Sequence, residues 1–158
     1  MIFEIGLFKD QNLILSRNYY RLRGVREDFK QERRSIVMKV ISDLSQNVLE
    51  KNITNFANSS YRIIFCTMTP SQEEKHKYLH IFIYAIGDLN SDPQIVTPLL
   101  QKLIDNFCVK FPDTCENSMV DSSRYEIFAS DIDEILKDEK LSPGDRVKSS
   151  LFKGSRSK

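Results

Sequence analysis

The sequence predicts an α+β fold in which one mainly antiparallel, five-stranded sheet is sandwiched between helices. Three observations carry this prediction: an opening β-hairpin, two apolar runs at residues 61–69 and 78–86, and three segments with helical periodicity. The two runs are apolar on both strand faces, and such strands usually need cover above and below. We therefore expect one helix on one face of the sheet and two helices on the other.

The chain opens with the pattern of a β-hairpin. Two β-rich runs, at residues 2–8 and 13–20, are separated by the polar turn-formers of residues 9–12, which is typical of two strands joined by a short turn. Simple alternation along the first run predicts that one face is formed by Phe3, Ile5 and Leu7.

The middle of the chain supplies one helix and three strands. Between residues 26 and 49 apolar side chains recur at steps of three and four, which predicts an amphipathic helix whose first turns carry most of the basic charge. A short strand is expected at residues 53–56. The two apolar runs are expected to be the fourth and fifth strands.

Two more helices are expected after the last strand. Asp92 followed by Pro93 is a favourable helix start, with an N-cap carboxylate before a proline in the first turn. This helix should end before Pro112, and Pro98 is an interior residue able to kink it. The final helix is expected at residues 125–137.

Size and composition indicate one globular domain. The 158 residues are 41% apolar and 28% charged, with a net charge of +1, which is ordinary for a globular protein. We expect a domain at residues 1–139 and a flexible basic tail at residues 140–158, because the tail has the composition of a linker. The sequence shows no apolar run long enough to span a membrane and no signal-peptide pattern, and its three cysteines lack CxxC spacing. A cytoplasmic location is therefore expected.

Motifs of catalysis and nucleotide binding are missing, so we expect neither an enzyme nor a cofactor site. The only histidines are His76, expected in a polar loop, and His80, expected in a strand. We therefore favour a surface loop residue and a partly buried sheet residue over a metal-binding pair. The acids of the last helix fan over a wide arc, and a solvated helix face is favoured over a cation site. These acids are Asp131, Asp133 and Glu134.

A basic run near the N-terminus is a candidate contact surface. Nucleic acid is disfavoured as its partner, because nucleic-acid binding gains from a strong overall positive charge, whereas the isoelectric point of this chain is near 7.7. A contact with protein or with anionic lipid remains open, as does a merely solvated basic face. The run comprises Arg17, Arg21, Arg23, Arg26, Lys30, Arg33 and Arg34.

Three segments give the chain a resemblance to a known family. They are the hairpin ending Leu-Ile-Leu-Ser-Arg-Asn-Tyr-Tyr-Arg at residues 13–21, the segment at residues 52–62, and the acidic Ile-Asp-Glu-Ile-Leu at residues 132–136. With the order of the expected elements, they resemble the longin domain, and more narrowly the N-terminal domains of adaptor and coatomer medium and small chains. The resemblance covers residues 1–139 and implies a longin-like (profilin-like) α-β-α sandwich.

The resemblance implies a non-enzymatic protein-interaction module of vesicle trafficking and protein transport. The implied partner is another longin or roadblock subunit, a coat subunit or a small GTPase, in a homodimer or heterodimer and with a possible peripheral contact to membranes. Longin proteins commonly dock an apolar partner segment between the first helix and the third strand. In this chain that groove would comprise Ile41, Leu44, Val48, Ile53 and Phe56.

The sequence departs from each branch of the family. We expect neither the large cargo-binding domain of medium chains, nor the heptad-repeat helix of a SNARE, nor a C-terminal anchor, because residues 1–158 show none of these patterns. A sensory or small-ligand-binding domain of the profilin-like or PAS-like kind is the alternative, since such domains also wrap helices on an antiparallel sheet. That alternative predicts an enclosed apolar cavity.

Overall fold

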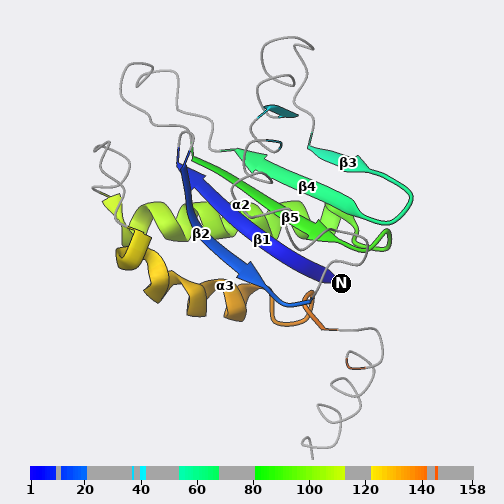
Figure 1. Ribbon diagram of the computed structural model, residues 1–158. Coiled ribbons are helices and arrows are strands. Elements are labelled where there is room, and N and C mark those ends of the chain that lie inside the picture. Colours follow the sequence, from blue (N-terminus) through cyan, green and yellow to red (C-terminus); the bar gives the residue numbers. More distant parts are fainter. Residues whose placement is uncertain are drawn as a thin grey trace, which may run out of the picture.

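The computed structural model describes residues 1–9, 12–20, 54–67, 81–112 and 122–141, together with Val37, Val40, Ile41 and Asp145. Within this part of the chain, five strands form one antiparallel sheet in the order β2-β1-β5-β4-β3 (Figure 1). The strands are β1 (Ile2–Lys9), β2 (Asn12–Asn18), β3 (Asn55–Ala57), β4 (Arg62–Thr67) and β5 (Ile81–Gly87). The predicted α+β class and five-stranded antiparallel sheet are confirmed.

Strand β1 departs from simple alternation at its start. The pairing of β1 with β5 shifts between Ile2 and Glu4, as a β-bulge does when it inserts one extra residue. As a result Ile2 joins the same core as Ile5 and Leu7. The expectation that Phe3 shares their face was therefore wrong, and the Phe3 ring instead packs edge-on against Tyr61, with 5.8 Å between the ring centroids.

One face of the sheet packs against the helices and forms a core that we call the aliphatic core, because the side chains that the strands contribute to it are mostly aliphatic. Alternate residues of the central strands, such as Leu7, Ile64 and Ile83, are buried there together with Leu103 of α2 and Ile132 of α3. The helical elements are α2 (Pro93–Lys110), the 3-10 helix η3 (Ser122–Phe128) and α3 (Ala129–Ile135). In Figure 1, α2 crosses behind the sheet and α3 lies beside β2.

Helix α2 begins and ends close to the predicted positions. The Asp92 side chain accepts a hydrogen bond from the backbone N–H of Gln94 at 2.9 Å, and Pro93 occupies the first turn. Proline fits there because the first turn has no intrahelical partner for its missing N–H. The helix continues through Pro98 and ends at Lys110.

The last helix is shorter than predicted. Its first part is the 3-10 helix η3, and α-helical structure begins only at Ala129. Tyr125 and Phe128 are both buried, and a 3-10 helix aligns residues three apart on one side. No side chain caps the start of α3, which follows η3 directly.

The opposite face of the sheet carries an aromatic core. Phe82 lies at its centre, with its ring centroid 5.7 Å from that of Phe8 and 5.6 Å from that of Phe65. Tyr84 and Ile86 complete the cluster, and Ile41 packs against it. The helix expected over residues 26–49 is described only at Val37, Val40 and Ile41, which are helical.

Candidate functional site

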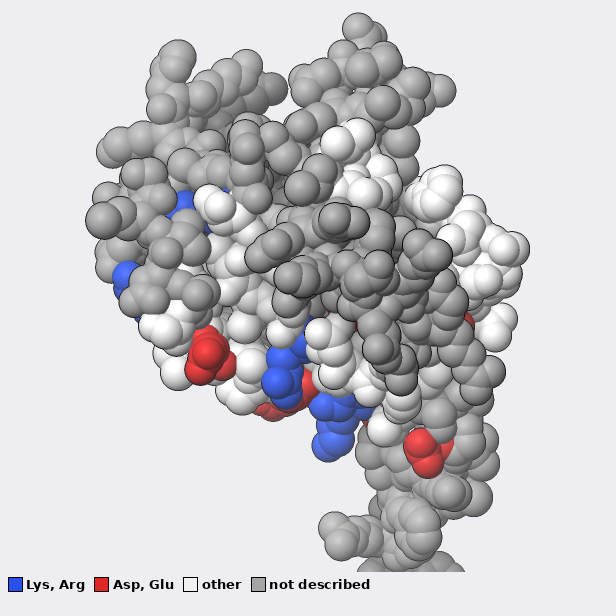
Figure 2. Space-filling view, in the orientation of Figure 1, with Lys and Arg blue, Asp and Glu red and all other residues white. Residues whose placement is uncertain are grey.

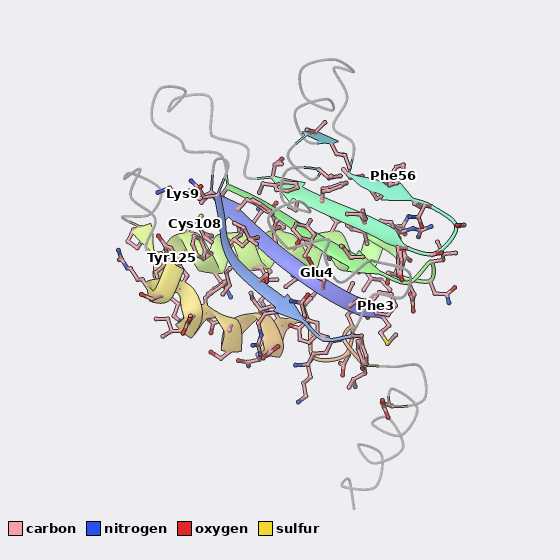
Figure 3. The ribbon with its side chains drawn as sticks, viewed as in Figure 1. Phe3, Glu4, Lys9, Phe56, Cys108 and Tyr125 are labelled. Carbon is pink, nitrogen blue, oxygen red and sulfur yellow. The ribbon has the colours of Figure 1, made fainter. Side chains whose placement is uncertain are left out.

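The outer strand β3 is the most accessible part of the sheet. It pairs with β4, and all three of its residues are exposed. Phe56 stands opposite Ile63, which packs on the aromatic core, so both side chains belong to that face of the sheet. Half of the Phe56 side chain remains exposed, at 50% (Figure 3). We call Asn55–Ala57 the β3 edge.

Two of the five residues predicted for a docking groove lie in the described part of the chain. Ile41 is half-buried against the aromatic core and Phe56 is exposed on the β3 edge. The structure therefore places both on the same side of the sheet. The other three predicted residues, Leu44, Val48 and Ile53, lie outside the described residues.

Arg17 is the one member of the predicted basic run that the structure describes, and it forms an ion pair. Its guanidinium donates a hydrogen bond to Asp133 at 2.5 Å, and Lys140 Nζ lies 3.4 Å from the other oxygen of the same carboxylate. The Arg17 side chain is 41% exposed. The remaining predicted basic residues, Arg21, Arg23, Arg26, Lys30, Arg33 and Arg34, lie outside the described residues.

Two of the three acids expected on a solvated helix face, Asp131 and Asp133, are ion-paired, whereas Glu134 is exposed. Burial by itself raises the pKa of Asp133, but the hydrogen bond from Arg17 and the positive charges nearby outweigh it and lower the pKa. Asp131 similarly accepts a hydrogen bond from Lys110 at 2.7 Å. Figure 2 shows blue and red side chains next to each other along the lower edge of this view. These contacts fasten α3 to β2 and α2.

A buried carboxyl group lies on the aromatic face of the sheet, where sequence reasoning assigned no role. Glu4 is 1% exposed, and its Oε1 accepts a hydrogen bond from the Tyr84 hydroxyl at 2.5 Å. Gly6 makes room for this contact, because a Cβ at that position would lie 2.3 Å from Cε1 of Tyr84. The signals in the sequence were an acid within an apolar strand and a glycine two residues later.

The thiol of Cys66 is placed for packing and not for nucleophilic attack. Cys66 is buried and donates a hydrogen bond to Oε1 of Gln101 at 3.1 Å. Burial raises its pKa to about 11, and the charge of Asp105 adds to the effect. Since the thiolate is the nucleophile, Cys66 is suited to packing in the core rather than to nucleophilic attack. Cys108 is half-buried beside the aliphatic core, and Cys115 lies outside the described residues.

Metal ligands do not converge in the described ranges, where no three His, Cys, Asp or Glu side chains gather around one point. His76 and His80 lie outside those ranges. No helix among the residues that the structure describes has both the length and the apolar character needed to span a bilayer.

Comparison with known proteins adds no relative: no protein-family model and no curated protein sequence matches this chain. The assignment of function therefore depends on the order of the elements and on the surface that they leave exposed.

Proposed function

We propose that this chain is a non-enzymatic protein-interaction module of the longin type. The order of the elements is the observation that carries the proposal. A β-hairpin is followed by the helical residues Val37, Val40 and Ile41, three antiparallel strands and the helical elements of the C-terminal part. This is the order expected from the resemblance of the sequence to longin domains.

The complete sandwich belongs to the same proposal. A helix over residues 26–49 would cover the aromatic core, while α2 and α3 cover the aliphatic core. Ile41 supports this arrangement, because it is helical and packs against the aromatic cluster. The burial of Phe8 and Tyr84, at 2% and 1% exposure, also supports it, since rings on that face are kept from water.

The β3 edge is the surface proposed to receive the partner. An outer strand carries backbone N–H and C=O groups that a partner strand can pair with. Phe56 adds a large exposed ring beside them, and aromatic side chains are frequent anchors in protein interfaces. The partner class that we propose is another longin or roadblock subunit, a coat subunit or a small GTPase.

Affinity purification from the native source, followed by mass spectrometry, tests this function. Binding of the purified partner is then measured for the unaltered chain and for Phe56→Ala. Loss of an aromatic anchor is expected to weaken binding by about 10-fold or more. Val109→Ala is the matched control, because Val109 is also an exposed apolar residue but lies on α2.

Two results would count against the proposal. One is a chain that neither self-associates in size-exclusion chromatography nor binds a coat subunit or small GTPase. The other is a Phe56→Ala variant that binds as tightly as the control. A small molecule retained in a native mass spectrum would instead favour the rival ligand-binding class.

Attachment to membranes is a separate part of the proposal and rests on the basic run and the basic tail of the sequence. A contact of basic residues with anionic lipid is screened by salt, because the Debye length falls from about 10 Å at 0.1 M to about 3 Å at 1 M. Liposome co-sedimentation at two salt concentrations, with and without residues 141–158, measures this contact. Binding that is independent of salt would contradict it.

A further inference from the structure

The register of β3 on β4 decides which backbone groups the β3 edge presents to a partner. The N–H of Phe65 donates to the carbonyl oxygen of Thr54 at 2.8 Å, and the N–H of Asn58 donates to the carbonyl oxygen of Tyr61 at 3.0 Å. Thr54 and Asn58 therefore turn their backbone groups toward β4. Since this direction alternates along an antiparallel strand, the backbone of Phe56 turns toward β4 as well.

Asn55 and Ala57 consequently turn their backbone N–H and C=O groups away from β4. β3 is the last strand in the order of the described sheet, and all three of its residues are exposed. The β3 edge thus offers outward backbone groups on each side of Phe56, whose ring stands on the aromatic side of the sheet. This arrangement is symmetric about Phe56.

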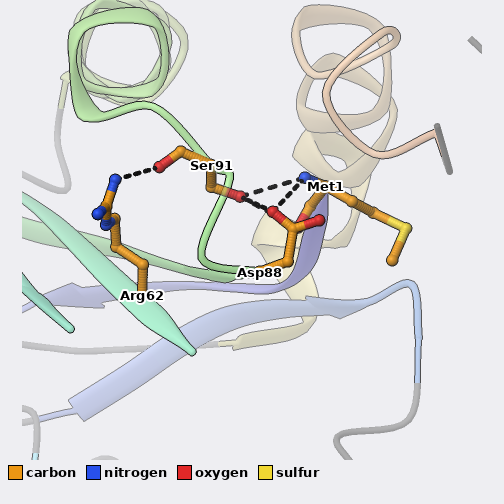
Figure 4. A network of polar contacts seen from close by, with 4 residues as sticks. All are labelled: Met1, Arg62, Asp88 and Ser91. Carbon is orange, nitrogen blue, oxygen red and sulfur yellow. Dashed lines mark hydrogen bonds and ion pairs between the residues drawn. The ribbon is translucent and has the colours of Figure 1, made fainter. Parts of the chain in front are cut away.

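The β3 edge is held in place from behind. Oδ1 of Asn58 accepts hydrogen bonds from the backbone N–H groups of Ser60 and Tyr61, at 2.8 Å and 2.7 Å, and fixes the turn between β3 and β4. Arg62 of β4 donates a hydrogen bond to the carbonyl oxygen of Ser91 at 3.0 Å, which ties β4 to the loop before α2 (Figure 4). A partner strand therefore meets a preformed edge, and binding orders little of this chain.

The two edges of the sheet are protected to different degrees. Natural proteins guard edge strands against pairing with charged side chains, with proline or with a covering element. At the other edge, β2 contacts η3 and α3, and its Arg17 is ion-paired with Asp133. β3 consists of Asn, Phe and Ala, and so carries neither a charge nor a proline. Its sequence leaves the edge open to pairing, and two copies of it meet without like-charge repulsion.

We propose that β3 pairs antiparallel with β3 of a second copy of this chain, in a reversible homodimer with two-fold symmetry. This inference rests on the function proposed above and names the partner of the β3 edge. Antiparallel strands pair where outward backbone groups face outward groups. A register centred on Phe56 meets this condition and pairs Asn55 of each copy with Ala57 of the other. A register centred on Asn55 or on Ala57 would leave part of β3 without a β3 residue opposite it.

The proposed register places the Phe56 residues of the two copies directly opposite each other, in a pair whose backbones exchange no hydrogen bonds. The Cα atoms of such a pair are about 4.5 Å apart, and both rings lie on the aromatic side of the joined sheet. Aromatic pairs across strands are favourable. A strand of three residues buries too little surface for a permanent dimer, so the association should increase with protein concentration.

A cysteine in place of Phe56 tests the register. Because a Cα separation of about 4.5 Å lies within the range of a disulfide, Phe56→Cys should give a 56–56 linked dimer under mild oxidation. Peptide mapping by mass spectrometry distinguishes this link from links through the native cysteines. Ala57→Cys is the matched control, since residue 57 of one copy would lie diagonally about 7–8 Å from residue 57 of the other, outside the usual range of about 4.4–6.8 Å. Equal yields of the 56–56 and 57–57 links would overturn the register.

A proline in place of Ala57 tests the backbone pairing. Ala57→Pro removes an N–H that points away from β4, so the pairing of β3 with β4 should persist. Self-association, measured by sedimentation velocity over a range of concentrations, should weaken by about 10-fold or more, because each copy loses a donor at the interface. Ala57→Val keeps the N–H and should associate like the unaltered chain. Far-ultraviolet circular dichroism checks that both variants are folded.

The outcomes separate this inference from the proposed function. A chain that stays monomeric at every concentration, yet binds a coat subunit or a small GTPase through Phe56, would overturn the homodimer and leave the proposed function standing. A chain that binds neither itself nor another protein would overturn both. Self-association that Ala57→Pro does not weaken would show that β3 is not the surface that pairs.

Discussion

Replacing Gly6 with alanine tests the contact between β1 and the buried tyrosine. The added Cβ would lie 2.3 Å from Cε1 of Tyr84 and 2.7 Å from its hydroxyl oxygen, so the ring must move. Overpacking a core costs about 1–3 kcal/mol, and the displaced hydroxyl loses a hydrogen bond to Glu4 worth about 0.5–1.5 kcal/mol. We expect Gly6→Ala to lower the free energy of unfolding by about 1.5–4.5 kcal/mol, the sum of these two effects.

The sign of this effect is diagnostic. Without the clash, alanine in a strand interior would stabilise the protein by about 0.5–1 kcal/mol relative to glycine. Urea denaturation followed by far-ultraviolet circular dichroism measures the difference, since the chain contains no tryptophan. In a Tyr84→Leu background, Gly6→Ala should cost far less, because the ring that it strikes is gone. An unchanged or raised urea midpoint, or an equal cost in both backgrounds, would refute the reasoning.

Three further predictions concern the helices and the buried thiol. Asp92→Ala removes the acceptor for the Gln94 N–H and should lower stability by about 1 kcal/mol in thermal denaturation. Asp92→Asn keeps a side-chain acceptor and should retain most of the stability. Equal losses in the two variants would contradict a capping role. Asp133→Asn breaks the pair with Arg17 and should cost about 1 kcal/mol at pH 7. Because folding lowers the pKa of Asp133, this contribution is fully present above about pH 4, the pKa in the unfolded chain, and is lost as the pH falls through the pKa in the folded chain. A stability difference between the unaltered chain and Asp133→Asn that persists to about pH 2 would contradict this reasoning. Cys66, whose pKa is raised to about 11, should react with iodoacetamide at pH 8 about 100-fold more slowly in the folded chain than in urea, as read by mass spectrometry.

Local patterns in the sequence were sufficient for the strands and for helix α2. The turn residues placed the opening hairpin, and Asp92 with Pro93 fixed the start of α2, because caps depend on residues close in sequence. The third strand was expected at residues 53–56 and is described at Asn55–Ala57. The 3-10 helix was not foreseen, since its aromatic spacing of three also fits an α-helix.

The polar contacts could not be predicted in the same way. Arg17 and Asp133 were assigned to separate basic and solvated surfaces, yet they meet because α3 packs beside β2. Glu4 and Tyr84 are eighty positions apart and become neighbours through the pairing of β1 with β5. Such contacts depend on strand order, which periodicity alone does not specify. Of the predicted groove, the structure describes Ile41 and Phe56, and it places both on the aromatic side of the sheet.

The position of Glu4 has a consequence for how the chain avoids misfolding. Glu4 belongs to β1, which lies between β2 and β5, and a slip of one residue in its pairing would exchange the two faces of the strand. The Glu4 carboxyl would then leave the Tyr84 hydroxyl and enter the aliphatic layer beneath α2, at a cost of about 2 kcal/mol or more. Glu4 thus raises the free energy of mispaired states of β1. It favours the register in which its carboxyl group accepts a hydrogen bond from the Tyr84 hydroxyl.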